Sequence, residues 1–261
     1  MDLSLTGKIA LVGGASQGIG YAIAHLLASE GASVAMVARK EEPLNEACAR
    51  ITAETGAKTF AIPADIRKGA DCEKIISQTL SKFKRVDILI NNDGAPPLGD
   101  LESFDDVAWQ KAIEQNLMSV VRLCRGALPS MQQQGWGRIV NITALSAIQP
   151  IARFGLSVAT WAGVLGYAKT LSLEIAAQGV TINTICPGRI ATGRLATVFG
   201  NGTPGQLEQE QMAQITKLIP MGRVGEPNEI AGLVAFLCSP WGAYMTGTVQ
   251  HVDGGRLGSL I

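Results

Sequence analysis

Short apolar runs alternate with longer amphipathic stretches along most of the chain. Six runs stand out, at residues 8–14, 33–39, 59–65, 86–92, 137–144 and 179–188. We interpret the strands within them as continuous apolar runs and not alternating ones, as expected of strands that are covered on both faces. The repeated strand-then-helix order implies right-handed crossovers. The pattern therefore predicts an α/β fold, with a single doubly wound parallel sheet and helices on both faces.

The chain shows no low-complexity linker and no internal repeat. Its 261 residues are therefore predicted to form one domain, over residues 1–261. The stretch at about residues 190–215 is polar and rich in glycine, which predicts a mobile lid over a site.

Composition excludes several classes of partner. The 22 basic and 22 acidic residues balance, so no net field attracts nucleic acid or an anionic membrane surface. The N-terminal residues lack the pattern of a secretion signal. Residues 230–250 carry no charge, but their glycines and Pro240 are typical of a helix end and a turn instead of a membrane span. The five cysteines are scattered without metal-ligand spacing, which predicts reduced thiols in a cytoplasmic protein and no metal site.

The segment "GGASQGIG", residues 13–20, directly follows the first apolar run and opens an amphipathic stretch. This context favours a dinucleotide-binding turn. Gly14 would permit the tight turn, while Gly18 and Gly20 would let a pyrophosphate and the helix approach closely. A helix N-terminus would then hold the phosphates through its unpaired N–H groups. The alternative is a purely structural glycine turn. The predicted contacts are Gly14, Ser16, Gln17, Gly18, Ile19 and Gly20.

The second apolar run ends at Ala38 and is followed by Arg39 and Lys40. A carboxylate at this place would accept hydrogen bonds from a ribose 2′-hydroxyl, whereas two cations suit a 2′-phosphate. We therefore predict NADP(H) in preference to NAD(H), with Arg39 and Lys40 as contacts. The alternative is that both residues are solvated surface charges.

Together, these motifs resemble the short-chain dehydrogenase/reductase family over nearly the whole chain. "ADI" at 64–66 resembles the family's adenine contact, and "NNDG" at 91–94 resembles its NNAG turn. "NTICPGRIAT" at 183–192 matches its Pro-Gly motif, and "YMTGTVQHVDGG" at 244–255 matches its C-terminal strand. Asn116 matches the asparagine of its catalytic set. The resemblance implies a Rossmann-fold oxidoreductase with further cofactor contacts from Asp65, Ile66, Asn92, Gly94, Thr143, Pro187, Gly188, Ile190 and Thr192.

The other catalytic positions depart from the family's pattern. The segment "AGVLGYAKTLSLE", residues 162–174, matches the family's helix downstream of the lysine. The match places Trp161 at the lysine, Ser157 at the tyrosine and Ala144 at the serine. Three of the four catalytic side chains are therefore predicted to be replaced.

Tyr167 and Lys169 lie two or more helical turns beyond these positions. We predict that they pack within the fold or against a neighbouring subunit and do not replace the missing pair. The resemblance further implies a homo-oligomer, a tetramer or a dimer.

Four polar side chains are candidates for the altered site. Ser157 could hydrogen-bond a substrate oxygen, or it could be a small filler at a helix start. Ser146 and Thr143 flank Ala144 and could donate to a substrate, or could be ordinary strand-end hydroxyls. Asp93 replaces the alanine of the NNAG turn, and its carboxylate is either a proton acceptor with a raised pKa or a turn-capping residue.

Larger side chains around the mouth of the predicted substrate site could likewise have either a binding role or a structural one. Arg153 and Arg189 could bind an acidic group of the substrate, or could be surface charges. Trp161 offers a flat apolar wall for a planar or aromatic small-molecule substrate, or simply packs. His25 lies among alanine and leucine on the first predicted helix and is interpreted as a packing residue, not a base.

Three hypotheses follow. The first is an NADP(H)-dependent oxidoreductase acting on a small carbonyl or alcohol, with a non-standard proton relay and Asn116, Ser157 and Ser146 as catalytic residues. The second is a non-redox isomerase or lyase that uses Asp93 or Ser146. The third is a nucleotide-binding protein without catalysis.

Overall fold

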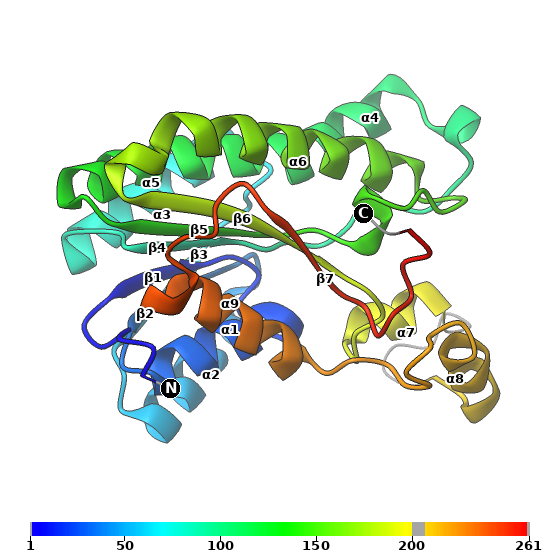
Figure 1. The fold of residues 1–261 in the computed structure, drawn as a ribbon, viewed down its shortest axis with the longest axis horizontal. Helices are drawn as coiled ribbons and strands as arrows, with labels where there is room; N and C mark the ends of the chain where they lie inside the picture. The colour runs from blue at the N-terminus through cyan, green and yellow to red at the C-terminus, as the bar shows by residue number, and fades with distance from the viewer. Residues whose placement is uncertain (1, 200–206, 260–261) are drawn as a thin grey trace.

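A seven-stranded parallel sheet forms the centre of the computed structural model, which describes residues 2–199 and 207–259 (Figure 1). The strand order is β3-β2-β1-β4-β5-β6-β7, and every neighbouring pair is parallel. This confirms the predicted doubly wound sheet. The strands are β1 (Ile9–Val12), β2 (Ser33–Ala38), β3 (Thr59–Pro63), β4 (Ile88–Asn91), β5 (Gly137–Ile142), β6 (Val180–Pro187) and β7 (Val249–Val252).

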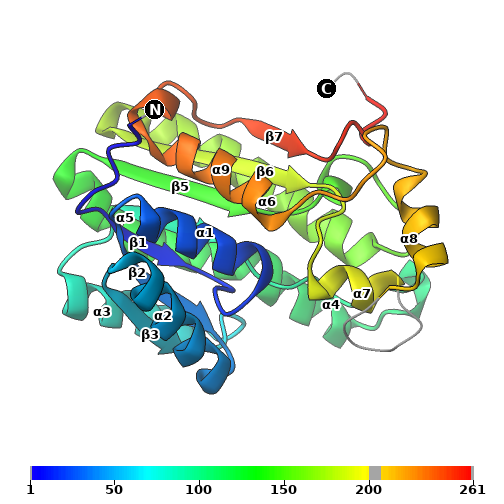
Figure 2. The same cartoon turned by 90° about the horizontal axis from the view of Figure 1, so that it is seen from below.

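Helices cover both faces of the sheet. One face carries α1, α2 and α9, which Figure 2 shows from the front, and the other face carries α3, α5 and α6. Two apolar cores correspond to these two layers. The helices are α1 (Gly18–Ser29), α2 (Glu41–Thr55), α3 (Gly69–Phe83), α4 (Asp106–Ile113), α5 (Ser119–Gln134), α6 (Gly155–Ile175), α7 (Gly193–Phe199), α8 (Gln209–Thr216) and α9 (Pro227–Cys238).

Each of the six apolar runs contains one strand, and the seventh strand lies in the C-terminal segment. All residues of β1, β4, β5 and β6 are buried. Burial on both faces is the physical reason why β1 and β4 are almost entirely apolar, because neither side of the sheet meets water there. Strands β5 and β6 also carry buried polar side chains.

The strand order reverses between β1 and β4. In open parallel sheets, a crevice forms beside the carboxyl ends of the strands at such a reversal, and ligands bind there. The glycine turn follows β1 and the "NNDG" segment follows β4, so the topology brings these two motifs to the same edge.

The segment predicted as a lid contains α7 and α8, but residues 200–206 lie outside the described residues, so a mobile lid stays a prediction. No helix in the described ranges is long and apolar enough to cross a membrane. Within the same ranges, no group of three or more potential metal ligands occurs. All five cysteines are buried free thiols.

Candidate functional site

The glycine turn after β1 is packed so closely that it excludes side chains. Gly14 and Gly18 have φ angles of +58° and +59°, in the left-handed region that favours glycine. A Cβ atom on Gly20 would lie 2.3 Å from the carbonyl oxygen of Gly14. The Asn92 side chain clamps the turn from β4, because its Nδ2 donates to the Gly13 carbonyl at 3.0 Å. The turn therefore presents bare backbone to the crevice.

The N-terminus of α1 faces this crevice with its backbone N–H groups. Gln17 is the N-cap residue, and its side chain makes no capping hydrogen bond to the N–H groups that follow at Gly18 and Ile19. The first turn of α1 contains no acidic side chain. Thr192, from the segment after β6, lies against Gly18, since a Cβ atom there would be 3.3 Å from the Thr192 methyl group. This arrangement can accept a phosphate.

Cations gather beyond the next strand. Arg39 and Lys40 are exposed at the end of β2. Arg67 donates to both carboxylate oxygens of Asp65, at 2.8 Å from Nε to Oδ1 and 2.6 Å from Nη2 to Oδ2. This hydrogen bonding lowers the pKa of Asp65, and the charge of Arg39 contributes a smaller lowering. Sequence reasoning missed Arg67, whose position two residues after Asp65 was the available signal.

Asp93 belongs to this charged group. Its side chain is exposed at the surface, yet the protein packed around it reduces the hydration of the carboxylate and raises its pKa from the ordinary 3.8 to about 6. The Gly94 N–H and the charge of Arg39 act in the opposite direction. The other charged groups that act on it are Asp65 and Arg67. The structure therefore groups Asp93 with the charged residues at the ends of β2 and β3.

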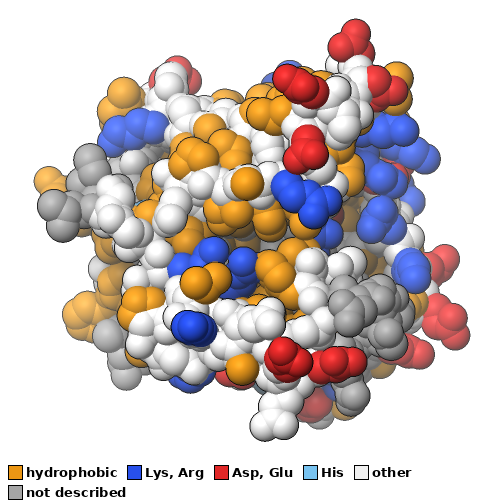
Figure 3. All heavy atoms as spheres, turned by 90° about the vertical axis from the view of Figure 1, so that its right-hand side faces the viewer, with side chains coloured by type: hydrophobic (Ala, Val, Ile, Leu, Met, Phe, Trp, Pro, Cys, Tyr) orange, Lys and Arg blue, Asp and Glu red, His pale blue; other side chains and the backbone are white. Residues whose placement is uncertain are grey.

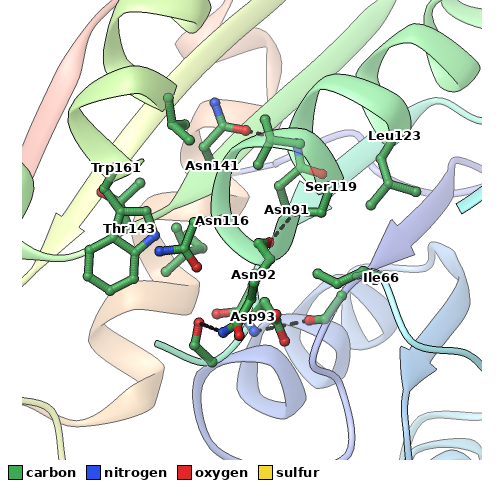
Figure 4. Close-up of a pocket in the computed structure, with 16 residues that line it drawn as sticks. Ile66, Asn91, Asn92, Asp93, Asn116, Ser119, Leu123, Asn141, Thr143 and Trp161 are labelled. Carbon is green, nitrogen blue, oxygen red and sulfur yellow. Dashed lines mark hydrogen bonds between the residues drawn. The ribbon is translucent and has the colours of Figure 1, made fainter. Parts of the chain in front are cut away.

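A cavity of about 30 Å³ extends from Asp93 and Ile66 to Trp161, with room for about two water molecules (Figure 4). Asn116 lines it from a π-helical turn, Glu114–Met118, which joins α4 to α5. Such turns are frequent at functional sites. Ser146 and Ser157 do not line this cavity, so the structure does not bring them together with Asp93 there.

The Asn116 side chain is held from one side only. Its Nδ2 donates to Thr160 Oγ1 at 2.8 Å, and that hydroxyl donates to the Leu156 carbonyl at 2.7 Å. The Asn116 Oδ1 atom is buried and has no hydrogen-bond partner among the described residues. Trp161, only 8% exposed, forms the wall next to Asn116 and Thr143 in Figure 4. Thr160, which fixes the amide, was also missed from the sequence.

Two buried hydroxyls lack partners near the start of α6. Ser157 lies in the first turn of α6 and Ser146 in a short 3₁₀ turn, Leu145–Ala147, and their exposed fractions are 1% and 2%. Neither Oγ atom has a hydrogen-bond partner among the described residues. Thr143 differs, because its hydroxyl already donates to the Ile185 carbonyl of β6 at 3.2 Å. Ser146 and Ser157 are thus the hydroxyls available to another polar atom.

The positions aligned with the missing catalytic groups lie close in the fold. Ala144 begins the 3₁₀ turn, which packs against α6. Trp161 follows Ser157 by one helical turn and is on the same side of α6. Tyr167 instead contacts Cys124 of α5, and burial raises the pKa of its hydroxyl. Tyr167 therefore packs against α5, whereas Lys169 is exposed on α6, so the packing role of Lys169 stays a prediction.

Residues after β6 and β4 complete the edge of the sheet that carries the crevice. Gly188 donates its N–H to Val252 at 2.9 Å, which places the Pro187–Gly188 step against β7. Ile190 is buried. Gln115 donates to the Gly94 carbonyl at 2.7 Å and fixes the loop after β4.

The remaining candidates separate by exposure. Arg153 is exposed, whereas Arg189 is half-buried with its guanidinium 3.6 Å from the centre of the Phe199 ring. His25 pairs with Glu54 of α2 at 2.8 Å, which agrees with a structural position.

The fold and the glycine turn at the strand reversal define a Rossmann-like, dinucleotide-binding architecture. A family model described as enoyl-(acyl carrier protein) reductase matches residues 14–256. The 3-oxoacyl-[acyl-carrier-protein] reductases of Vibrio cholerae and Escherichia coli are 36% and 37% identical to the chain over 253 residues, which are 97% of this chain and 98% of each relative.

Solved structures agree with this assignment. L-Sorbose reductase from Gluconobacter frateurii, complexed with NADPH and L-sorbose, has a TM-score of 0.93 at 31% identity, with both chains fully covered. YwfH, an NADPH-dependent reductase involved in bacilysin biosynthesis, has a TM-score of 0.93 at 29% identity, covering 98% of this chain and 100% of that one. The chain therefore belongs to the short-chain dehydrogenase/reductase family of oxidoreductases.

Proposed function

We propose that the chain, as one domain over residues 1–261, binds NADP(H) in preference to NAD(H) and transfers a hydride between it and a small carbonyl or alcohol substrate. Its proton relay would differ from that of relatives that carry the serine, tyrosine and lysine. The observation that carries this proposal is the set of buried, unpartnered polar atoms, Ser146 Oγ, Ser157 Oγ and Asn116 Oδ1. A polar ligand or water would supply the partners that these atoms lack.

The residues present fit a phosphorylated dinucleotide. The glycine turn has no room for a Cβ atom at Gly20, and the N–H groups at the start of α1 are not capped by a side chain. Arg39 and Lys40 offer charge for a 2′-phosphate without a neighbouring strand-end carboxylate at Ala38. The NADPH complex of the sorbose reductase and the NADPH dependence of YwfH support the same preference.

Bound NADPH would supply the hydride, and this chain's own residues would place the substrate and guide the proton. Ser157 would hydrogen-bond the substrate oxygen, and Asn116 would hold water through its free Oδ1 atom. A serine hydroxyl without a nearby cation is a weak acid at neutral pH. Losing general acid catalysis slows a reaction by about 10²–10⁴-fold, so we expect slow turnover unless water or the substrate delivers the proton.

A nucleotide-binding protein without catalysis is the second candidate. It is favoured by Trp161, which is buried beside Asn116 at the position aligned with the family's lysine and brings no charge to the site. A non-redox reaction through Asp93 has less support, because the charged groups that act on Asp93 are Arg39, Asp65 and Arg67.

The test is a fluorescence titration with NADPH and, separately, NADH. We expect tighter binding of NADPH. The variant Arg39→Ser should weaken NADPH binding by about 10- to 100-fold, since a charged hydrogen bond contributes about 1.5–3 kcal/mol, and should leave NADH binding unchanged. Arg125→Ser, which removes an exposed charge from α5, is the matched control. Equal affinities for both cofactors in the wild-type protein would refute the NADP(H) preference.

Turnover separates the remaining possibilities. Reduction of ketones or quinones by the NADPH complex would support the oxidoreductase. Tight NADPH binding without turnover across such a panel would favour the second candidate. Light scattering would test the homo-oligomer, which we retain as a proposal from the family resemblance.

A further inference from the structure

Two arginines lie at the carboxyl ends of the last two strands of the sheet. Strands β6 and β7 pair in parallel, with Pro187 opposite Val252. Arg189 follows the first of these strands and Arg256 the second, so the sheet brings both to the edge that carries the nucleotide crevice. They are close enough for the charge of Arg256 to act on Arg189.

Neither arginine forms an ion pair among the described residues. The nearby carboxylates already have other partners. Glu229 accepts from both Nη atoms of Arg223, at 2.9 and 2.7 Å, and from a backbone N–H. Asp253 accepts from the N–H groups of Gly255 and Leu257, at 2.9 and 2.7 Å. Glu229 and Asp253 line a hollow together with Arg189, but Glu229 is paired with Arg223 and Asp253 is held by backbone N–H groups, so neither carboxylate forms an ion pair with Arg189 or Arg256.

Arg189 is also partly removed from water. Its guanidinium stacks on Phe199 at the end of α7, 3.6 Å from the ring centre. Burial, and secondly the charge of Arg256, lower the pKa of Arg189 to about 10, so it remains charged at neutral pH. Two neighbouring cations in a partly dehydrated place are unfavourable, and an anion bound between them would relieve this repulsion.

The residues around the arginine pair suit the binding of one part of a substrate. Figure 3 shows the face that carries this edge, where Lys and Arg side chains lie among apolar ones around a hollow. Ile190 and Thr192 continue directly from Arg189 toward the glycine turn, which Thr192 contacts. The arginine pair is thus continuous with Ile190 and Thr192, which are among the proposed cofactor contacts.

We propose that Arg189 and Arg256 bind an oxyanion of the substrate, a carboxylate or phosphate group, while Phe199 holds the Arg189 guanidinium flat against it. This inference rests on the proposed function and narrows its substrate to an anionic carbonyl or alcohol compound. It also explains why an arginine at the mouth is stacked and half-buried instead of extending into solvent.

The test is isothermal titration calorimetry on the NADPH-saturated protein with benzoylformate, an aromatic 2-oxo acid, and with its methyl ester. We expect the acid to bind at least about 10-fold more tightly than the ester, since one charged hydrogen bond contributes that much. Arg189→Gln and Arg256→Gln should each weaken binding of the acid by about 10-fold and leave the ester unaffected. Arg125→Gln removes an exposed charge from α5 and should change neither affinity.

Three results would overturn the inference: equal binding of acid and ester, an equal loss in Arg125→Gln, or no saturable binding of either benzoylformate or inorganic phosphate. Circular dichroism establishes that both variants are folded, and Arg256→Gln provides an independent test if Arg189→Gln is not. A parallel NADPH titration keeps the proposals apart. If NADPH does not bind, the proposed function fails, while titration of the cofactor-free protein still decides whether the arginine pair binds the anion.

Discussion

Restoring the three aligned side chains is the sharpest test of the altered site. The variant Ala144→Ser, Ser157→Tyr, Trp161→Lys would place a serine, a tyrosine and a lysine on the 3₁₀ turn and on the first two turns of α6. A lysine cation one helical turn from the tyrosine lowers the pKa of the phenol from near 10 and makes it a usable acid. We expect reduction of an activated ketone by NADPH to rise by about 10²–10⁴-fold, or roughly 3–5 kcal/mol of barrier.

The same change lowers stability. Trp161 is only 8% exposed, and truncating a buried tryptophan costs about 3–5 kcal/mol. Lysine recovers part of this loss because its methylene stem can pack. A loss of this size is a large share of the roughly 5–15 kcal/mol of a typical domain. The assay therefore belongs at low temperature with NADPH at about 100 times its Kd, which adds about 2.7 kcal/mol to a protein that binds it.

A matched variant isolates proton donation. Ala144→Ser, Ser157→Phe, Trp161→Lys carries the same ring without the hydroxyl, so it shares the packing and the cation but has no acid. Stopped-flow oxidation of NADPH should show the gain only with tyrosine. A folded, NADPH-binding tyrosine variant that is no faster than its phenylalanine counterpart would refute either the alignment or a redox-competent pocket.

Three further outcomes are expected. Gly20→Ala should abolish NADPH binding by fluorescence and lower stability by about 1–3 kcal/mol in thermal unfolding, because its Cβ would lie 2.3 Å from the Gly14 oxygen; Gly166→Ala, with open space around it, should not. The NADPH affinity of Asp93→Asn should rise relative to that of the wild-type protein as pH increases through about 6, since Asp93 is neutral below its raised pKa and adds negative charge above it, whereas ionisation of the cofactor phosphate is common to both proteins. Ser157→Ala should stabilise the ligand-free protein by about 1 kcal/mol in denaturant unfolding, because it removes a buried unpartnered hydroxyl, yet slow turnover.

The sheet could be predicted from the sequence because its signal is local. Six of the seven strands lie in short runs rich in apolar residues, and most of their residues are buried. The seventh strand, β7, has no such run and was recognised only as part of a family motif. The glycine turn was predictable for the same reason, since its three glycines lie within seven residues and meet steric demands of the turn itself. Its Asn92 clamp was recognised only as part of a motif, and the hydrogen bond to Gly13 joins residues 79 positions apart.

The electrostatics of the site could not be predicted, because they depend on contacts between distant segments. Asp93 was a candidate base from its motif, but its charged neighbours come from the ends of β2 and β3. Arg189 stacks on Phe199 because of the placement of α7, and it lies near Arg256 because β6 pairs with β7. No periodicity in the chain indicates these side-chain contacts, since sequence patterns report which face of an element is buried and not which side chains contact one another there.

The unpartnered hydroxyls and the arginine pair both favour a bound ligand, for different physical reasons. Ser146 and Ser157 are neutral groups removed from water without a partner, and each such group costs about 1–3 kcal/mol in the free protein. Arg189 and Arg256 are like charges that act on each other and form no ion pair among the described residues, which also lowers stability. An alanine or an uncharged residue at these positions would be more stable. Under the proposed function and the further inference, both costs would disappear when a polar, anionic substrate offers a hydrogen-bonding oxygen to the hydroxyls and an anionic group to the arginines.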